Sequence, residues 1–329
     1  MRQLNRWWLL ILLLILPWLP LSGLRAEERL RVVATTTQAA DLVRVIGGER
    51  AALTALMGSG VDPHLYKPTE SDIAAMSAAQ VVVYNGLNLE GQFETVFEAL
   101  GQRAVRTYAL SEPVVQAGLI QEETAGVPDP HFWLDPRNWM LAAEGLAEML
   151  AEADAANADF YRANAAAYIK QLETLYEWAA AAMTDESIPE TKRVLVTSHD
   201  AFQYFGNAFG WRVRGIQGVS TEAEASVSDI QAVAGLVASE GIAAIFVESS
   251  VPRATVEAVI AAARARGAEV RLGVRELYSD AMGAPDAFGG TYIEMIVHNV
   301  VTILQSFGYA VPPLPESLGI VLPEEFQER

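Results

Sequence analysis

One uninterrupted helical stretch constrains the fold of this sequence most. Residues 157–184 contain neither proline nor glycine. Asp154 and Asn157 are suitable N-cap residues before this stretch, and Asp185 with Pro189 ends it. At about 1.5 Å per residue it would form a rod of roughly 42 Å. Its larger apolar residues recur every three, four or seven positions and so share one helical face: Phe160, Tyr161, Tyr168, Leu172, Leu175 and Trp178, with Ala165 and Ala179 between them.

The segments on both sides of this helix alternate between β-rich runs and helical patterns. Such alternation predicts an α/β fold with mostly parallel sheets, and the position of the long helix predicts two lobes joined by a rigid strut. Expected strands are 29–37, 51–57, 80–84 and 104–109 before the helix, and 192–197, 211–216, 243–247 and 269–272 after it. Expected helices are 38–46, 71–79, 92–100 and 138–151, then 201–209, 227–239, 255–266 and 291–306, while 111–130 is expected to be irregular.

The first 26 residues have the layout of a secretory signal peptide. Arg2 and Arg6 precede an apolar run at 7–16. Pro17 ends that run before it is long enough for a typical membrane-spanning helix. An uncleaved N-terminal anchor is the alternative. The predicted division is therefore a signal peptide at 1–26, an N-terminal lobe at 27–153, the linking helix at 154–184 and a C-terminal lobe at 185–329.

The absence of cysteine and the net charge of the sequence limit which compartment and which partners are expected. The predicted signal peptide leads us to expect a periplasmic protein. The sequence has no cysteine, so we expect no disulfides, no thiolate metal site and no lipid-anchoring cysteine. Its formal net charge is −18, and an acidic surface repels the phosphate backbone of nucleic acids. Nucleic acid is therefore not an expected partner.

Three of the four histidines lie in loops that follow predicted strands. His64 lies in VDPHLYKPTE, His131 in DPHFWLDP, and His199 in TSHDAF directly after the strand KRVLVT. Ligand sites in open α/β sheets form outside the carboxyl ends of strands, and neutral imidazole is the commonest protein ligand for zinc and similar ions. The pattern predicts a metal site between the lobes. His298 lies inside the last predicted helix and is interpreted as structural.

A carboxylate is expected as the fourth ligand, because it would offset part of the charge of a divalent ion. Asp280 in LYSDAMG fits best, since it opens a loop after the last strand and Gly283 gives that loop freedom to turn. Asp286 and Glu248 are the alternatives.

These loops carry a family resemblance. VDPHLYKPTESDI, HFWLDPRNW, VTSHDAFQYFGNAFGW, GVSTEAEAS, and LYSDAMG followed by TYIEMIVHN resemble the corresponding loops of cluster A-I substrate-binding proteins, the zinc- and manganese-binding receptors of ABC importers. The resemblance covers nearly all of the chain after the predicted signal peptide. It implies two Rossmann-like lobes linked by one long helix, with metal ligands at His64, His131, His199 and Asp280.

Two departures from the family pattern bear on the metal. Zinc-uptake members often have a histidine-rich loop in the first lobe, but 111–130 contains no histidine. Many manganese members have glutamate where this chain has His199. Three nitrogens and one carboxylate suit zinc, which also binds such sites more tightly than manganese. Zn²⁺ is therefore the predicted cargo, with Mn²⁺ as the alternative.

The predicted function is capture and delivery of a metal ion, without catalysis. Four protein ligands leave no obvious position for the water that a catalytic zinc site requires. The resemblance implies an ABC permease and its ATPase as partners, and we expect a monomer. The alternative from another class is a secreted zinc-dependent hydrolase, although the sequence has no H-E-x-x-H motif.

Overall fold

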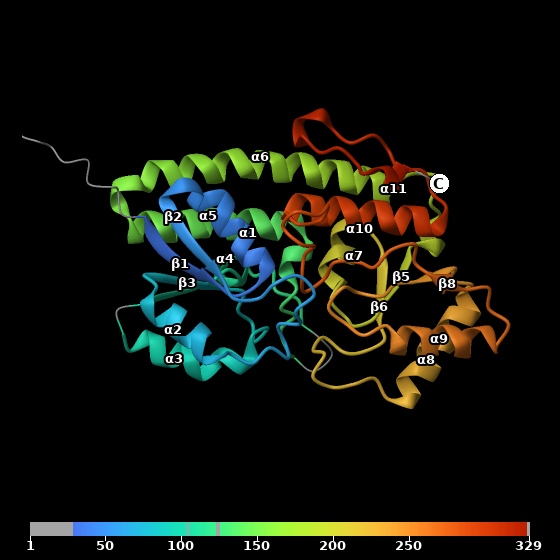
Figure 1. Ribbon diagram of the computed structural model, residues 1–329. Coiled ribbons are helices and arrows are strands. Elements are labelled where there is room, and N and C mark those ends of the chain that lie inside the picture. Colours follow the sequence, from blue (N-terminus) through green and yellow to red (C-terminus); the bar gives the residue numbers. More distant parts are fainter. Residues whose placement is uncertain (1–28, 104, 123–125, 328–329) are drawn as a thin grey trace, which may run out of the picture.

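The computed structural model describes residues 29–103, 105–122 and 126–327. The predicted signal peptide at 1–26 therefore lies outside the described residues. Within them the chain forms two α/β lobes beneath one long helix, α6 (Ala158–Met183), which runs over both lobes (Figure 1). The predicted fold class is confirmed. None of the described helices has the length and hydropathy needed to cross a membrane.

The first lobe contains a fully parallel sheet in the order β2-β1-β3-β4. Its two faces follow from the alternation of side chains along each strand. Val32 and Val81 pack into the core shared with the long helices, whereas Val33 and Val82 pack against Met76 and its neighbours on the other face. The strands are β1 (Leu30–Ala34), β2 (Ala51–Ala55), β3 (Val81–Tyr84) and β4 (Arg106–Ala109), and the helices are α1 (Thr37–Gly47), α2 (Glu70–Ala78), α3 (Glu94–Gly101), α4 (Glu112–Gln116) and α5 (Pro136–Ala153).

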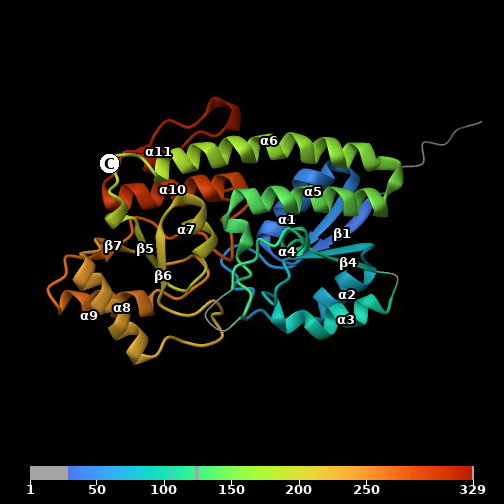
Figure 2. The same cartoon turned by 180° about the vertical axis from the view of Figure 1, so that it is seen from behind.

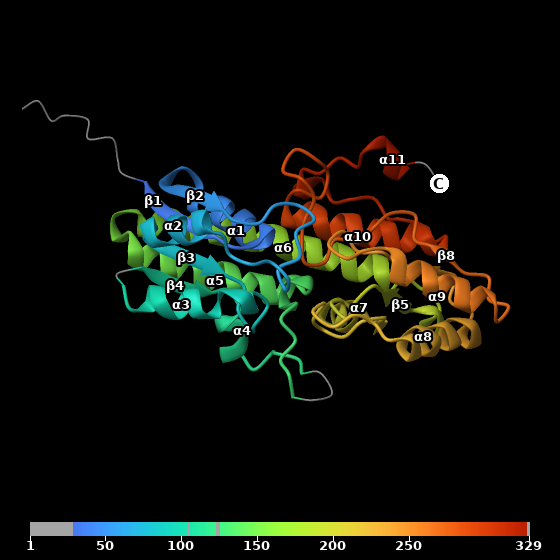
Figure 3. The ribbon, with the colours of Figure 1, turned by 60° about the horizontal axis from the view of Figure 1, so that its bottom comes forward.

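The second lobe repeats this strand order. β5 pairs with β6, β7 pairs with β8, and a parallel bridge between Thr197 and Phe246 joins the two pairs, which gives the order β6-β5-β7-β8. In Figure 3, α8 and α9 lie at the opposite end of the molecule from α2 and α3. The strands are β5 (Val194–Thr197), β6 (Arg212–Gly215), β7 (Ala244–Ile245) and β8 (Arg271–Leu272), and the helices are α7 (Gln203–Phe209), α8 (Val227–Glu240), α9 (Ala254–Arg264), α10 (Tyr292–Phe307) and α11 (Glu324–Gln327).

The long helix α6 belongs to the cores of both lobes. It packs on α1 and α5 of the first lobe, and it also contacts α10 of the second lobe. Tyr161, Tyr168, Leu172 and Trp178 are buried in one cluster that also includes Val32 of the first sheet and residues of α10. The predicted apolar face is thus the face that packs, except that Phe160 is only partly buried. A continuous core of this kind makes α6 a stiff connection.

Two regions differ from the sequence prediction. The stretch 111–130 contains the short helix α4, which lies beside α5 (Figure 2). Pro113 within its first turn favours a helix start, and Val114 is fully buried. The strands expected at 243–247 and 269–272 form ladders over only two residues each.

Short 3₁₀ helices occur at Gly48–Arg50, Gly91–Phe93, Phe132–Leu134, Ala155–Asn157, Glu190–Lys192 and Glu316–Leu318.

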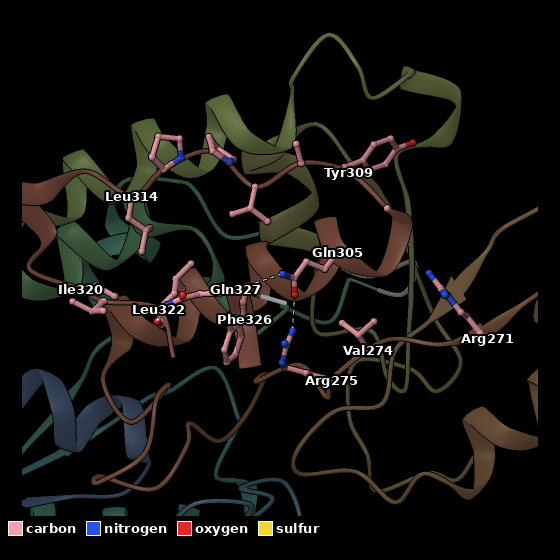
Figure 4. Close-up of a pocket in the computed structure, with 16 residues that line it drawn as sticks. Arg271, Val274, Arg275, Gln305, Tyr309, Leu314, Ile320, Leu322, Phe326 and Gln327 are labelled. Carbon is pink, nitrogen blue, oxygen red and sulfur yellow. Dashed lines mark hydrogen bonds between the residues drawn. The ribbon is translucent and has the colours of Figure 1, made fainter. Parts of the chain in front are cut away.

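A cavity of about 910 Å³ lies between the end of α10 and the segment 309–327 (Figure 4). Leu314, Leu322 and Phe326 contribute to its apolar wall. Arg275 lies over the Phe326 ring, 3.9 Å from its centroid, and donates a hydrogen bond to Gln305 Oε1 at 2.7 Å. None of the four predicted metal ligands lines this cavity.

Candidate metal centre

The structure brings the four predicted ligands together between the lobes. His64 lies in the loop after β2, His131 in the segment before α5, His199 after β5 and Asp280 in the loop between β8 and α10. One potential ligand atom from each residue lies within 4.8 Å of the others, and all four residues are buried. Among the described residues, they form the group of histidine and acidic side chains that could hold a metal ion. Two residues therefore come from each lobe.

Asp280 faces two imidazoles at once. Its Oδ1 atom lies 3.1 Å from His131 Nε2, and its Oδ2 atom lies 3.3 Å from His199 Nε2. The two Nε2 atoms are themselves 3.3 Å apart. The ring of His64 completes the group, with its centroid 5.5 Å from that of His131 and 5.9 Å from that of His199. The three rings and the carboxylate thus surround one small volume.

Carboxylates behind two of the imidazoles fix how those rings point. Asp129 Oδ1 lies 2.8 Å from His131 Nδ1, and Glu248 Oε2 lies 2.7 Å from His199 Nδ1. A proton on His131 Nδ1 would face Asp129 and leave the Nε2 lone pair directed at the shared volume. Glu248 lies against His199 Nδ1 as a close charge contact without hydrogen-bond geometry. Carboxylates placed in this way orient histidine ligands and increase their basicity at metal sites.

His64 is supported differently. Its backbone N–H donates to Asp62 Oδ1 at 2.9 Å, just as the backbone N–H of His131 donates to Asp129 Oδ1 at 2.9 Å. The second oxygen of Asp62 accepts a hydrogen bond from the Thr221 hydroxyl at 2.6 Å. The buried Nε2 atom of His64 has no hydrogen-bond partner among the described residues. A buried, unpaired ring nitrogen that faces two imidazoles and a carboxylate is suited to a metal ion.

The Asp280 loop is fixed by groups of the first lobe. The carbonyl of Ser279 accepts hydrogen bonds from Gln38 Nε2 at 2.9 Å and from Trp133 Nε1 at 3.1 Å. The backbone N–H of Met282 donates to Thr37 Oγ1 at 2.9 Å. Asp280 is therefore held on both sides by backbone contacts with the opposite lobe.

Burial and charge have opposite effects on the four groups. Burial, only partly opposed by Asp280, lowers the pKa of His64 to about 3. Burial would lower the pKa of His131 too, but Asp129 and Asp280 outweigh it and raise that pKa to about 9. For His199, Glu248 and Asp280 outweigh burial and raise the pKa well above its usual range.

Asp280 responds in the opposite direction. Burial would raise its pKa, but the imidazoles of His199 and His131 hold the pKa well below its usual range. At neutral pH the group without metal therefore contains an ionised carboxylate, a neutral His64 and protonated imidazoles at His131 and His199. Exchanging two protons for one divalent cation leaves the formal charge of the group unchanged.

The other sequence candidates lie elsewhere or have another role. Glu248 is buried, but it supports His199 and is outside the four-residue group. Asp286 is exposed. His298 lies 22 residues after Glu276 and its Nε2 is 2.8 Å from the Glu276 carbonyl oxygen, beside the Tyr278 and Phe326 rings.

Sequence reasoning missed the supporting residues Asp62, Asp129 and Thr221. The repeated Asp-Pro-His sequence at 62–64 and 129–131 is the signal that could have indicated two of them. An aspartate two residues before a histidine can accept that histidine's backbone N–H, as both do here.

Comparisons with known proteins agree on one family. A family profile described as "Zinc-uptake complex component A periplasmic" matches residues 32–306. The manganese-binding lipoprotein MntA of Bacillus subtilis is 40% identical over 285 residues, which cover 87% of this chain and 92% of that protein. The zinc-binding protein TroA of Treponema pallidum is 40% identical over 280 residues, which cover 85% of this chain and 89% of that protein.

Solved structures show the same architecture. The periplasmic zinc-binding protein TroA from Treponema pallidum superposes with a TM-score of 0.81 at 38% identity, covering 85% of this chain and 99% of that chain. The Fe(III)-bound protein YtgA from Chlamydia trachomatis superposes with a TM-score of 0.77 at 26% identity, covering 86% and 100%. The names of these similar proteins include zinc, manganese and iron.

Proposed function

The chain belongs to the zinc-uptake complex component A family of metal-binding receptors of ABC importers, and from this membership we propose that His64, His131, His199 and Asp280 hold its cargo. The receptor captures one divalent transition-metal ion between its lobes and delivers it to the importer. The observation that supports this proposal most strongly is the meeting of four buried potential ligand atoms from four loops within 4.8 Å.

Zinc is the proposed cargo, with manganese as the alternative. Three imidazole nitrogens and one carboxylate are typical of zinc, whereas manganese favours oxygen ligands. Zinc also exceeds manganese in affinity for a given set of nitrogen and oxygen ligands. The relatives named for manganese and zinc are equally similar in sequence, at 40% identity each. Similarity alone therefore favours neither metal, and the preference for zinc rests on the three imidazoles.

The proposed role is transport and not catalysis. The matching family is described as a component of a zinc-uptake complex, and the relative from Treponema pallidum is named a zinc-binding protein. Four converging protein side chains would satisfy a tetrahedral ion, whereas a catalytic zinc site usually keeps one position open for water. The alternative of a secreted zinc-dependent hydrolase requires such an open position.

The lobes are proposed to move only slightly during capture and release. α6 belongs to the cores of both lobes, so a wide hinge movement would break its packing. Loop rearrangement and a small displacement of one lobe would suffice to separate ligands that come from opposite lobes. The lobe boundaries proposed for this movement are 27–153 and 185–329, with 154–184 as the connection.

The proposed partners are an ABC permease and its ATPase, which would recognise the metal-loaded receptor. The matching family and the TroA structure are described as periplasmic, and the relative from Bacillus subtilis is named a lipoprotein. A monomeric, lipid-free form in the periplasm stays a prediction for this chain.

Elemental analysis of purified protein tests the proposal directly. We expect one zinc ion per chain in the original protein and in His298→Gln, whose side chain lies outside the four-residue group. Purified His64→Ala and Asp280→Ala should lose stoichiometric metal, because the three remaining ligands hold zinc more weakly. Competition between Zn²⁺ and Mn²⁺ on the stripped protein then tests the cargo. Unchanged stoichiometry in both ligand variants would contradict the assignment of the site.

A further inference from the structure

Each of the three histidines has its backbone N–H held by a carboxylate, but the three carboxylates use their remaining contacts differently. Asp129 and Glu248 also lie within 2.8 and 2.7 Å of the Nδ1 atom of the histidine they support. Asp62 instead contacts the Thr221 hydroxyl with its second oxygen. His131 and His199 are therefore supported within their own lobes, whereas the support of His64 continues into the other lobe.

Thr221 connects the second lobe to the His64 loop of the first lobe. It lies in the loop between β6 and α8 of the second lobe, and its side chain is buried. Its hydroxyl is 2.6 Å from Asp62 Oδ2, while Asp62 Oδ1 accepts the backbone N–H of His64 at 2.9 Å. Two hydrogen bonds and one carboxylate thus connect Thr221 to a proposed ligand that it does not touch.

We propose that Thr221 is a positioning residue for metal binding, and that it places His64 through Asp62 when the two lobes lie together. The inference rests on the proposed function. Without the hydroxyl, Asp62 keeps only its contact with the His64 backbone and is free to rotate. His64 then loses the support that the second lobe provides, while His131, His199 and Asp280 keep theirs.

The Asp62–Thr221 contact also couples the position of His64 to the closure of the lobes. Hydrogen bonds to ionised carboxylates are strong when they are partly removed from water, so the Asp62–Thr221 contact favours the closed arrangement of the lobes. Separation of the lobes breaks this contact and frees the His64 loop at the same step. The position of His64, like that of Asp280, therefore depends on contacts across the lobe boundary.

Zinc dissociation from the full-length metal-loaded protein tests the inference. Thr221→Val removes the hydroxyl with little change in shape, and we expect zinc to transfer to a chelator faster. Loss of a direct partner of a metal ligand typically lowers affinity by roughly 10- to 100-fold, and this range is the upper limit for Thr221, which acts through Asp62. Thr221→Ser, which keeps the hydroxyl, should dissociate at a rate close to that of the original protein. The absorption spectrum of the Co²⁺-loaded Thr221→Val protein should shift toward that of His64→Ala.

A neighbouring contact provides a matched control. Gln92 Nε2 donates to Glu222 Oε1 at 3.2 Å, so it joins the same second-lobe loop to the first lobe without touching Asp62 or His64. Gln92→Leu should therefore leave zinc dissociation nearly unchanged. If Gln92→Leu accelerated dissociation as much as Thr221→Val, the effect would belong to lobe contact in general and the inference would be wrong.

A double-mutant cycle separates action through His64 from other effects. Thr221→Val should cause no further loss of zinc affinity in a His64→Ala background. An undiminished effect in that background, or an unchanged dissociation rate in Thr221→Val alone, would overturn the role of Thr221 while leaving the proposed function intact. Failure of the original protein to bind stoichiometric metal would overturn the proposed function, and with it this inference.

Discussion

The Nε2 atoms of His131 and His199 lie 3.3 Å apart across the lobe boundary. Two nitrogens bound tetrahedrally to one zinc ion at about 2.0–2.1 Å would be roughly 3.3–3.4 Å apart. The pair therefore has the separation that a tetrahedral zinc site requires, although the two side chains are 68 residues apart in sequence. The Asp280 carboxylate, at 3.1 and 3.3 Å from the same two nitrogens, balances the charge of whatever occupies this position.

Glu248 should matter for zinc affinity without being a ligand. Its two oxygens contact both the backbone N–H and the Nδ1 atom of His199, so Glu248→Gln removes the negative charge that favours a proton on Nδ1. We expect roughly 10- to 100-fold weaker zinc binding, with one ion still bound at saturation. Isothermal titration calorimetry with a competing chelator measures both quantities. Loss of the ion at saturation would instead identify Glu248 as a ligand.

Zinc affinity should rise with pH across the neutral range. The pKa values of His131, at about 9, and of His199, well above its usual range, mean that both rings hold protons that a metal ion must displace. Below those pKa values, each displaced proton changes the apparent affinity about tenfold per pH unit. With two protons displaced, log Kd should fall by about two per unit rise in pH between pH 6 and 8.

Proton release provides an independent check of this pH dependence. Zinc added to stripped protein in weakly buffered solution at pH 7 should release about two protons per ion. The pKa of His64 is about 3, so this ring is already neutral and should contribute none. A pH-independent affinity, together with no proton release, would show that His131 and His199 are neutral before metal binds.

The sequence predicted the elements that depend on local pattern and missed those that depend on pairing in space. The periodic apolar residues from Tyr161 to Trp178 predicted α6 to within about two residues at each end. The histidine loops indicated the candidate metal site, because residue type and the positions of His64 and His199 after strands are visible in sequence. His131 was also expected to follow a strand, but α4 lies between β4 and His131. Glu248 was considered as a ligand, but the structure places it behind His199, which only the pairing of β5 with the segment after β7 determines.

The two Asp-Pro-His sequences also show that local sequence does not determine which groups meet in space. Asp62 and Asp129 make the same backbone contact with the histidine two residues later. Their remaining contacts differ, since Asp129 reaches an imidazole and Asp62 reaches Thr221 in the other lobe. Identical local sequence cannot specify this difference, because it arises from which loop of the opposite lobe lies nearby.

His298 should make the protein sensitive to acid. Burial lowers its pKa to about 4, although its contact with the Glu276 carbonyl acts in the opposite direction. The unfolded chain gains this proton near pH 6.5 and the folded chain only near pH 4, so stability falls as pH decreases through that window. The contribution is at most about 3–4 kcal/mol.

Urea unfolding of the metal-free protein at several pH values measures the contribution of His298. His298→Gln should remove this part of the loss of stability between pH 6.5 and 4, while the contribution of His64, which has the same sign, remains in both proteins. Parallel curves of stability against pH for the original protein and the variant would show that His298 does not contribute to the acid sensitivity.

The shared core around α6 predicts that the two lobes unfold together. Leu172 is fully buried at the middle of α6, in the cluster that includes residues of both lobes. Leu172→Ala should lower the free energy of unfolding by about 2–5 kcal/mol, because it removes buried methyl groups and leaves a cavity. Glu173→Ala changes the exposed neighbour on the same helix and should alter stability by less than about 0.5 kcal/mol. In urea unfolding of each variant, circular dichroism and tryptophan fluorescence should follow the same single transition. Its midpoint should be lower than that of the original protein in Leu172→Ala and unchanged in Glu173→Ala. Two separate transitions would show that α6 does not couple the lobes.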